Sequence, residues 1–523
     1  MKSHTKRSWG EAFMALTNGR VITMLFLGFS AGIPILLIFS TLSIWLREAG
    51  VERATVTYFS WAALGYSFKF VWAPIIDRLP LPGLHATLGR RRSWLIVAQT
   101  AIIISILWMG LTDPAHHLTM MAFAAVALGF SAATQDIVID AYRIEAVDTD
   151  LQAMMSSAYI AGYRIGMIVA GAGALTIASL VEGNGAYMPL AWRVAYGCMA
   201  LAMCVGVLTT LLISEPDVPR KDSKYFHQTS DYIRFLLMFA LTVIAFIAAN
   251  IWAGNAMSPL RENFIATGMT KELAGFITGS LQLAIAVLLA VGVAWLTTLI
   301  GITPREMVRE TYIAPVKDFI DRYGKVAIIV LALIGFYRIA DIVMGVMANV
   351  FYTDIGFSKE EIAAVSKTFG LFMTICGSFL GGILSVRYGV IRVLFLGALL
   401  SAVTNILFAI MAQIPANTAM FAVVIMADNL SGGLATAAFI AYLSGLTNIS
   451  FTAMQYAIFS SIMTLFPKVI AGFSGTAVDA VGYQAFFVGT AILGLPVLVL
   501  VVLAGRLTDV EHPKARKAQN PNR

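Results

Sequence analysis

The sequence is short of charge and of cysteine. Asp, Glu, Lys and Arg make up only 12% of its 523 residues and hydrophobic residues make up 59%, whereas a water-soluble domain carries roughly 25% charged residues. This composition excludes a water-soluble fold. The three cysteines, Cys198, Cys204 and Cys376, all fall within apolar segments, where free cysteine behaves as a small buried hydrophobe. We therefore predict no disulfide.

Motifs that would identify an ATP-driven pump or a metalloenzyme are also missing. The sequence has no GxxxxGK[ST] phosphate loop, no HExxH helix and no Cys/His cluster with metal-ligand spacing. We expect no metal and no other cofactor, and no enzymatic activity. The formal charge of +7 needs no nucleic-acid partner, because basic loops on the cytoplasmic side of a membrane account for it.

Long apolar runs dominate what is present. A helix needs about 20 apolar residues to cross about 30 Å of hydrocarbon, and fourteen runs come near or exceed this length. Such runs are typical of helices and not of the roughly ten-residue alternating strands of an outer-membrane barrel. We predict an all-α polytopic membrane protein with spans at 21–46, 56–76, 94–112, 118–142, 152–181, 191–213, 232–253, 273–300, 325–351, 361–385, 391–413, 417–446, 452–477 and 483–505.

The distribution of basic residues gives the orientation. With the N-terminus placed in the cytoplasm, most of the 36 Lys and Arg residues fall in cytoplasmic segments, as the positive-inside rule requires. An even number of spans returns the C-terminal tail to the same side. We therefore expect a multi-pass protein with both termini in the cytoplasm.

A weak internal repeat divides the chain. At an offset of 300 residues, Ala141-Tyr142 pairs with Ala441-Tyr442 and Ala153-Met154 pairs with Ala453-Met454, each at the turn between two spans. Duplicated transporter folds leave this kind of similarity. We predict two six-helix bundles, 1–213 and 325–505, separated by a linker with two additional spans, 214–324, and followed by a cytoplasmic tail, 506–523.

Charged residues inside the spans are the main candidates for function. A carboxylate facing lipid costs several kcal/mol, so such residues normally face the bundle interior or a watery path. Asp136, Asp140 and Arg143 share one face of the fourth span. Arg164 falls at nearly the depth of Asp136, and we expect these two residues to pair across the hairpin. The second half carries Arg338, Asp341 and Asp428 instead.

Structural explanations compete with functional ones for each of these residues. The ions can be pairs that lock helices together, and Asp140 and Arg143 can lie at the wet cytoplasmic end of their span. Lys69 and Lys468 are weaker candidates, because a long lysine stem lets the charge reach an interface. Tyr142 can stack on a sugar ring, although aromatic side chains in membrane proteins usually serve core packing or interface belts.

Two stretches carry a resemblance to a known family. Ala73-Pro74-Ile75-Ile76-Asp77-Arg78 followed by Gly89-Arg90-Arg91-Arg92 resembles the loop between helices 2 and 3 of the major facilitator superfamily, with a longer spacing here. Gln135-Asp136-Ile137-Val138-Ile139-Asp140-Ala141-Tyr142-Arg143-Ile144-Glu145 is similar to a run in the AmpG-type muropeptide permeases. The resemblance covers the whole chain, including two extra helices between the six-helix halves. Acetyl-coenzyme A transporters are a related group and stay an alternative.

The resemblance implies a function. AmpG-type permeases carry out proton-coupled import of anhydromuropeptides, which are sugar-peptide fragments of peptidoglycan, from the periplasm to the cytoplasm of Gram-negative bacteria. This import serves cell-wall recycling, and the supply of muropeptide governs β-lactamase induction in many such species. By position, Gln135, Asp136, Asp140 and Arg143 come from the family run. Asp77, Arg90, Arg91 and Arg92 match the facilitator loop thought to latch the inward-closed state.

Together these observations predict a monomeric secondary transporter of the bacterial inner membrane that works by alternating access, with substrate near the midplane. The candidate substrate-binding residues are Gln135, Tyr142, Arg164, Arg338 and Asp428. The candidate proton-coupling residues are Asp136, Asp140 and Asp341. The candidate gating residues are Asp77, Arg78, Arg90, Arg91, Arg92 and Arg143. A membrane-embedded enzyme acting on lipid or sugar precursors, a channel and a receptor are the alternatives from other classes.

Overall fold

The computed structural model describes residues 9–52, 59, 66, 68–182, 187–218 and 229–507. Every regular element in this part of the chain is a helix, so the predicted all-α fold is confirmed. Among these residues, thirteen helical stretches are long and apolar enough to cross a membrane, and each matches a predicted span. The remaining predicted span, 56–76, lies mostly outside the described residues.

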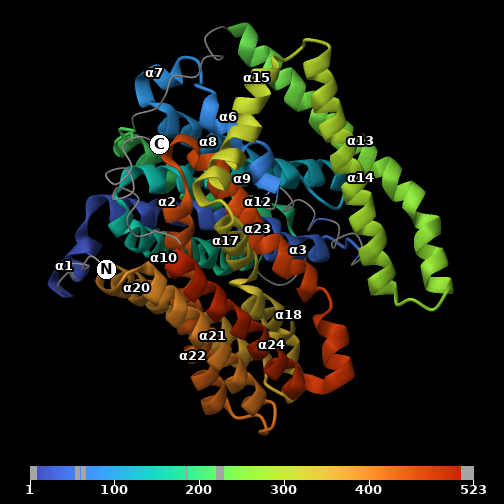
Figure 1. Ribbon diagram of the computed structural model, residues 1–523. Coiled ribbons are helices and arrows are strands. Elements are labelled where there is room, and N and C mark those ends of the chain that lie inside the picture. The colour runs from blue at the N-terminus through green and yellow to red at the C-terminus, as the bar shows by residue number, and fades with distance from the viewer. Residues whose placement is uncertain are drawn as a thin grey trace. The chain divides into compact units, whose positions relative to one another are not determined.

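The N-terminal half begins with a short helix, α1 (Trp9–Met14), and a span that is broken at Phe39 into two helices (Figure 1). Two short helices then precede the four long ones that carry most of the charged candidates. In chain order the elements after α1 are α2 (Gly19–Ile38), α3 (Ser40–Glu48), α6 (Ala73–Arg78), α7 (Leu84–Leu88), α8 (Arg90–Leu111), α9 (Leu118–Ala146), α10 (Gln152–Ile168), α11 (Ala174–Glu182) and α12 (Pro189–Leu212).

The C-terminal half has a similar succession of long helices. Its first span is interrupted at Tyr337 and Arg338, and a π-helical segment, Ile362–Phe369, opens the next span. Its last helix bends at Gly482. The elements are α17 (Val326–Phe336), α18 (Ile339–Ile355), α19 (Lys359–Glu361), α20 (Gly370–Tyr388), α21 (Val390–Met411), α22 (Thr418–Leu446), α23 (Thr452–Ala471) and α24 (Ser474–Leu507).

Three pairs of helices in the two halves start 300 positions apart, the offset of the sequence repeat: α8 and α21, α9 and α22, and α10 and α23. α8 and α21 have 22 residues each, and α9 and α22 have 29 each. Both α8 and α21 follow a glycine with positive φ, Gly89 (82°) and Gly389 (88°). A residue with a side chain adopts this conformation only at a cost in energy, so both halves turn into their third span in the same way.

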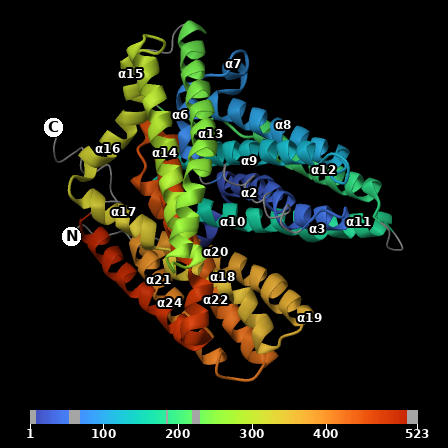
Figure 2. The same cartoon turned by 90° about the vertical axis from the view of Figure 1, so that its right-hand side faces the viewer.

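Glycines let pairs of spans approach through their backbones in both halves. A Cβ atom on Gly32 would lie 2.0 Å from the carbonyl oxygen of Tyr163, and one on Gly162 would lie 1.9 Å from that of Leu25. These contacts bring α2 against α10, as Figure 2 shows. In the C-terminal half a different pair of spans, α20 and α22, approaches in this way through Gly377 and Gly433, whose added Cβ atoms would lie 2.0 and 2.2 Å from a backbone oxygen. Small residues at such positions are typical of packed membrane helices.

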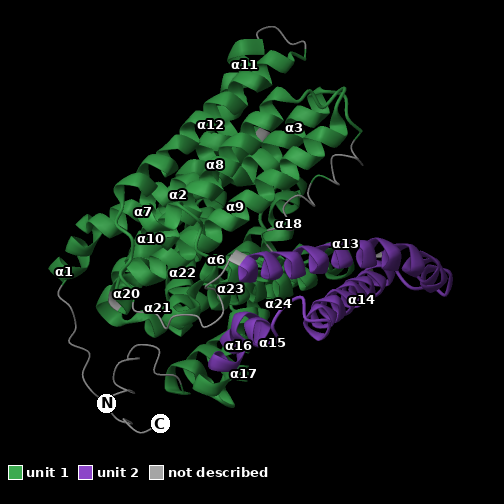
Figure 3. Cartoon of the chain, turned by 90° about the horizontal axis from the view of Figure 1, so that it is seen from above, with its two compact units in different colours: residues 1–219, 320–523 green, residues 220–319 purple. Residues whose placement is uncertain are grey.

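Residues 220–319 form a compact unit separate from residues 1–219 and 320–523 (Figure 3); the predicted linker was 214–324. Its main elements are α13 (Thr229–Ala266) and α14 (Lys271–Leu299), which form a hairpin. The side-chain amide of Gln282 donates to the Asn250 backbone oxygen at 2.9 Å within this hairpin. The unit continues through α15 (Arg305–Val308) into α16 (Ala314–Tyr323).

Candidate transport site and interhalf latch

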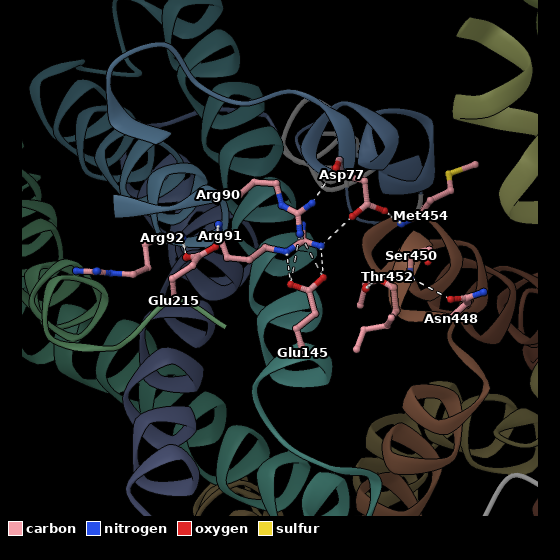
Figure 4. Close-up of polar contacts among 11 residues, drawn as sticks. Asp77, Arg90, Arg91, Arg92, Glu145, Glu215, Asn448, Ser450, Thr452 and Met454 are labelled. Atoms are coloured by element: carbon pink, nitrogen blue, oxygen red, sulfur yellow. Dashed lines mark hydrogen bonds and ion pairs between the residues drawn. The ribbon is translucent and has the colours of Figure 1, made fainter. Parts of the chain in front are cut away.

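Arg91 joins two carboxylates near the first turn of α8 (Figure 4). Its side chain is fully buried, and its Nη2 atom lies 2.8 Å from Asp77 Oδ1 and 2.6 Å from Glu145 Oε1. Its Nε atom donates to the second oxygen of Glu145 at 2.9 Å. The fork-to-fork geometry with Glu145 makes this a strong charge-assisted pair. Arg90 adds a weaker contact to Glu145 at 3.5 Å and donates to the backbone oxygen of Asp77 at 3.1 Å.

The same network reaches the C-terminal half. Asp77 Oδ2 accepts a hydrogen bond at 2.9 Å from the backbone N–H of Met454, in the first turn of α23, where the helix dipole favours a negative charge. We call Asp77, Arg91, Glu145 and the Met454 N–H the interhalf latch. Its members come from α6, α8, α9 and α23, so the ion network of one half holds the first turn of a helix in the other.

Two further predicted gating residues lie beside the latch. Arg143 Nη1 donates to Ser444 Oγ on α22 at 2.6 Å, which is a second direct bond between the halves. The Arg78 guanidinium lies over the ring of Phe451, 5.4 Å from its centroid, a favourable cation–π distance. The structure thus brings Asp77, Arg78 and Arg143 to one end of the spans, where the two halves meet.

Sequence reasoning missed Glu215, which completes this end of the N-terminal half. Its carboxylate accepts hydrogen bonds from the backbone N–H groups of Arg91 (2.7 Å) and Arg92 (3.0 Å). Arg92 in turn donates to the backbone oxygens of Thr210 (3.0 Å) and Leu211 (2.7 Å) at the end of α12. Burial raises the pKa of Glu215, and the two N–H donors oppose that rise. The only signal in the sequence is that two acidic residues, Glu215 and Asp217, follow the sixth span, and nothing in the sequence distinguishes Glu215 from Asp217.

Asp140 is balanced by two cations. Its Oδ1 atom lies 3.2 Å from Arg143 Nη2, and its Oδ2 atom lies 3.4 Å from Lys69 Nζ. The stem of Lys69 is long enough to reach an interface, which made this residue a weaker candidate, but its side chain is only 10% exposed and faces α9. The reason is the partner, since a buried ammonium is tolerated where a carboxylate pairs with it. Arg143 also lies over the ring of Tyr456, 5.0 Å from its centroid.

The expected pair between Asp136 and Arg164 is wrong. Asp136 Oδ1 instead accepts a hydrogen bond from the Tyr159 hydroxyl at 3.5 Å, and the contact of Arg164 is with the sulfur of Met167 at 3.8 Å. Equal depth along two helices does not fix the direction in which their side chains point. Tyr159 and Arg164 are five residues apart, which puts them about 140° apart around α10 at about 3.6 residues a turn.

The C-terminal half has a cluster with more negative than positive charge. Arg338, in the break before α18, lies 3.7 Å from Asp341 Oδ2 through its Nε atom and donates to Thr436 on α22 at 3.1 Å. Asp341 accepts a hydrogen bond from the Ser401 hydroxyl on α21. Asp428 on α22 accepts one from Thr404 at 3.4 Å and lies within electrostatic reach of Asp341.

The two remaining candidates lie in different surroundings. Gln135 is fully buried, and neither atom of its amide has a hydrogen-bond partner among the described residues. The Tyr142 hydroxyl donates to the Ser214 backbone oxygen at 3.3 Å. Tyr142 lines a cavity of about 860 Å³ with residues of α2 and α12, and that lining contains none of the charged residues predicted to bind substrate. The roles predicted for Gln135 and Tyr142 stay predictions.

Comparison with known families and structures identifies the fold. A family model described as Major Facilitator Superfamily matches residues 327–522, and one described as Acetyl-coenzyme A transporter 1 matches residues 21–188. The proton:xylose symporter XylE, bound to 6-bromo-6-deoxy-D-glucose, aligns with a TM-score of 0.56 at 12% identity over 95% of this chain and 96% of its own. The fold is that of the major facilitator superfamily, as predicted.

Relatives with similar sequences cover nearly the whole chain. Putative transporter AmpG 4 of Rickettsia felis is 27% identical over 491 residues, which is 94% of this chain and 98% of that protein. The anhydromuropeptide permease of Escherichia coli K12 is 26% identical over 485 residues, which is 92% of this chain and 79% of that protein. The predicted relationship to AmpG-type proteins is thereby confirmed.

Proposed function

We propose, from the premise that this homologue of AmpG-type permeases has the major facilitator fold, that it carries anhydromuropeptides across the bacterial inner membrane. Import runs from the periplasm to the cytoplasm, a proton gradient drives it, and both termini face the cytoplasm. The relative from Escherichia coli is named for this substrate. In this role the monomeric protein serves peptidoglycan recycling and, through the supply of muropeptide, β-lactamase induction.

The observation that carries this proposal is the arrangement of two arginines, one from each half. Arg164 on α10 and the start of α18 at Arg338 are close enough for the charge of Arg338 to act on Arg164. No carboxylate among the described residues forms an ion pair with Arg164. Two half-buried like charges repel each other, so an anion between them stabilises both.

The chemistry of the substrate fits this pair. A muropeptide carries peptide carboxylates, and a guanidinium binds a carboxylate through two parallel hydrogen bonds. Because Arg164 and Arg338 belong to different halves, a substrate that contacts both is held only while the halves are close at this depth. Binding is thereby linked to the rocking motion of a duplicated transporter.

The interhalf latch supplies the other part of alternating access. In the proposed orientation it lies at the cytoplasmic end, where it keeps the halves together while the periplasmic side is accessible. Separation of the halves at this end breaks the hydrogen bond from Met454 to Asp77 and that from Arg143 to Ser444. Both bonds join groups that water can solvate once the halves part, so the closed state is reversible.

A second candidate substrate is acetyl-coenzyme A, because a family model for such a transporter matches residues 21–188. Its phosphates are also anions that the arginine pair can bind. Uptake of labelled acetyl-coenzyme A separates the two candidates. The parent protein should not accumulate it under our proposal and should accumulate it under the alternative.

The direct test is uptake of labelled anhydromuropeptide into proteoliposomes under an imposed pH gradient. We expect saturable accumulation by the parent protein. Arg164→Gln should raise the KM by about 10-fold to 100-fold, because hydrogen bonds to charged groups contribute about 1.5–3 kcal/mol. Arg193→Gln is the matched control, since Arg193 is an exposed residue of α12, and its KM should equal that of the parent.

Two outcomes would overturn the proposal. Absence of muropeptide uptake by the folded parent would reject the substrate class. Chemical conversion of the muropeptide without accumulation inside the vesicles would favour a membrane-embedded enzyme instead.

A further inference from the structure

The interiors of the two halves carry unbalanced charges of opposite sign. In the N-terminal half Asp140 forms ion pairs with both Lys69 and Arg143. Asp136 interacts electrostatically with Lys69. Arg164 is the surplus charge there, and it is positive. In the C-terminal half one arginine, Arg338, faces two carboxylates, so the surplus there is negative. The lysines of the C-terminal spans, Lys367 and Lys468, are exposed and do not alter this balance.

Asp428 is the carboxylate that carries this surplus negative charge. It forms no ion pair with a basic side chain of the described residues, and its hydrogen bond comes from Thr404 at 3.4 Å. The charged and titratable groups that face it are Asp341 and Arg338, with Tyr352 of α18 also in electrostatic reach. The Nε atom of Arg338 lies 3.7 Å from Asp341 Oδ2, so this arginine pairs with the other carboxylate. An uncompensated carboxylate at this depth costs several kcal/mol, and binding a proton removes that cost.

A second observation concerns an amide on α21, the helix whose hydroxyls bond both carboxylates. Asn405 is fully buried, and both atoms of its side-chain amide lack a hydrogen-bond partner among the described residues. It follows Ser401 by four residues on α21 and therefore lies on the same helix face as the hydroxyl that bonds Asp341. A buried amide without a protein partner is normally satisfied by ordered water, and water beside two carboxylates gives a proton a route to them.

We propose that Asp341 and Asp428 together hold the coupling proton and that Arg338 links this proton to the bound substrate anion. The inference rests on the proposed function and names its coupling site. While Arg338 interacts with Asp341, it lowers the affinity of the carboxylate pair for a proton. When a substrate carboxylate engages Arg338, that effect weakens and the pair binds a proton from water. One O–H bond forms on one of the two carboxylates, and the substrate is not altered.

The linkage is reciprocal, as thermodynamics requires. Protonation of the pair releases Arg338 from Asp341 and makes the guanidinium available to the substrate. Anion and proton therefore bind together, and the surplus negative charge of the C-terminal half is neutralised in the loaded state. The N-terminal half has no equivalent, because Ile35 and Leu128 stand there at the positions of Asp341 and Asp428, with the first spans of the two halves aligned at Gly50 and Gly356. The sequence-based prediction placed proton coupling at Asp136, Asp140 and Asp341. Our inference keeps Asp341, moves Asp428 from substrate binding to coupling, and leaves out Asp136 and Asp140.

The test separates net transport from exchange. Proteoliposomes with the parent, Asp428→Asn, Asp136→Asn or Asp354→Asn receive labelled anhydromuropeptide in two assays, accumulation under a pH gradient and counterflow against unlabelled substrate inside. A gradient of about one pH unit supports about tenfold accumulation if one proton is coupled. Asparagine mimics the protonated carboxyl, so the loaded carrier still exchanges substrate. Asp354 is the control, because it is an exposed carboxylate at the far end of α18.

We expect Asp428→Asn to lose this accumulation and to keep counterflow within about threefold of the parent, which corresponds to less than 1 kcal/mol. Asp136→Asn and Asp354→Asn should still accumulate substrate. Accumulation by Asp428→Asn equal to that of the parent, or its loss in Asp136→Asn alone, would overturn the inference. Failure of the parent in both assays would instead reject the proposed substrate, and retained counterflow shows that a variant is folded.

Discussion

Arg91 and Ile391 occupy the same position in two equivalent helices, two residues after a glycine with positive φ. In the N-terminal half the position holds an arginine between Asp77 and Glu145, and in the C-terminal half it holds an aliphatic residue that packs against Gly505. The helix therefore forms with either an arginine or an aliphatic residue at this position, so its start does not need the ion network. What the network adds is the hydrogen bond from Met454 of α23 to Asp77, which joins the two halves.

The largest difference between the halves should appear at this pair of positions. Arg91→Ala removes the main cation of two buried carboxylates and leaves Glu145 its longer contact with Arg90. Breaking a buried pair in this way costs about 3–5 kcal/mol. Ile391→Ala removes only part of a half-buried aliphatic side chain and should cost about 1–2 kcal/mol. Thermal unfolding of the purified variants in detergent measures both. A loss of stability in Ile391→Ala as large as that in Arg91→Ala would show that packing, and not the ion network, governs this end of the helices.

Glycine packing should give equal effects in the two halves. Gly162→Ala and Gly433→Ala each place a Cβ atom about 2 Å from a backbone oxygen of the neighbouring span, and overpacking of this kind costs about 1–3 kcal/mol. Gly279 of α14, whose added Cβ would meet nothing within 4 Å, serves as the control in Gly279→Ala. If one half tolerated its substitution and the other did not, the similarity in packing between the halves would not extend to their energetics.

The smallest of these effects should come from Glu215. Glu215→Ala removes the acceptor of two backbone N–H groups in the first turn of α8, and loss of such a cap costs about 0.5–2 kcal/mol. Asp217→Ala is matched in chemistry and lies two residues away at an exposed position, so it should leave the melting temperature unchanged. Equal melting temperatures for both variants would mean that the carboxylate of Glu215 contributes no stability.

Hydropathy and motif spacing were sufficient for the architecture. The thirteen described spans follow from runs of apolar residues, because in lipid a helix is the structure that satisfies its own backbone. The latch residues Asp77 and Arg91 could be found because they stand in a recognisable loop. The bounds of α9 and α22 differ by the 300 residues of the repeat. This match could be predicted because a repeat is recognised from spacing along the chain alone.

Side-chain partners across spans could not be predicted, because they depend on how each helix is rotated about its axis. Asp136 and Arg164 have the same depth but different directions, so their expected pairing failed. The sequence ranked Lys69 as a weak functional candidate because its long side chain can reach water. Its environment is decided instead by the direction of the side chain toward Asp140. The interaction of Asp341 with Asp428 could not be predicted for the same reason, because the two residues lie on different spans that are far apart in the sequence.

The central claim is that an anionic substrate and a proton bind together, with the proton in the C-terminal half. Calorimetric titration of the purified protein with anhydromuropeptide, in buffers of different ionisation enthalpy, counts the protons taken up per substrate bound. The account predicts uptake that approaches about one proton within some range of pH and no uptake at any pH in Asp428→Asn. Binding without proton uptake by the parent across the whole range, or equal uptake by Asp428→Asn, would contradict it.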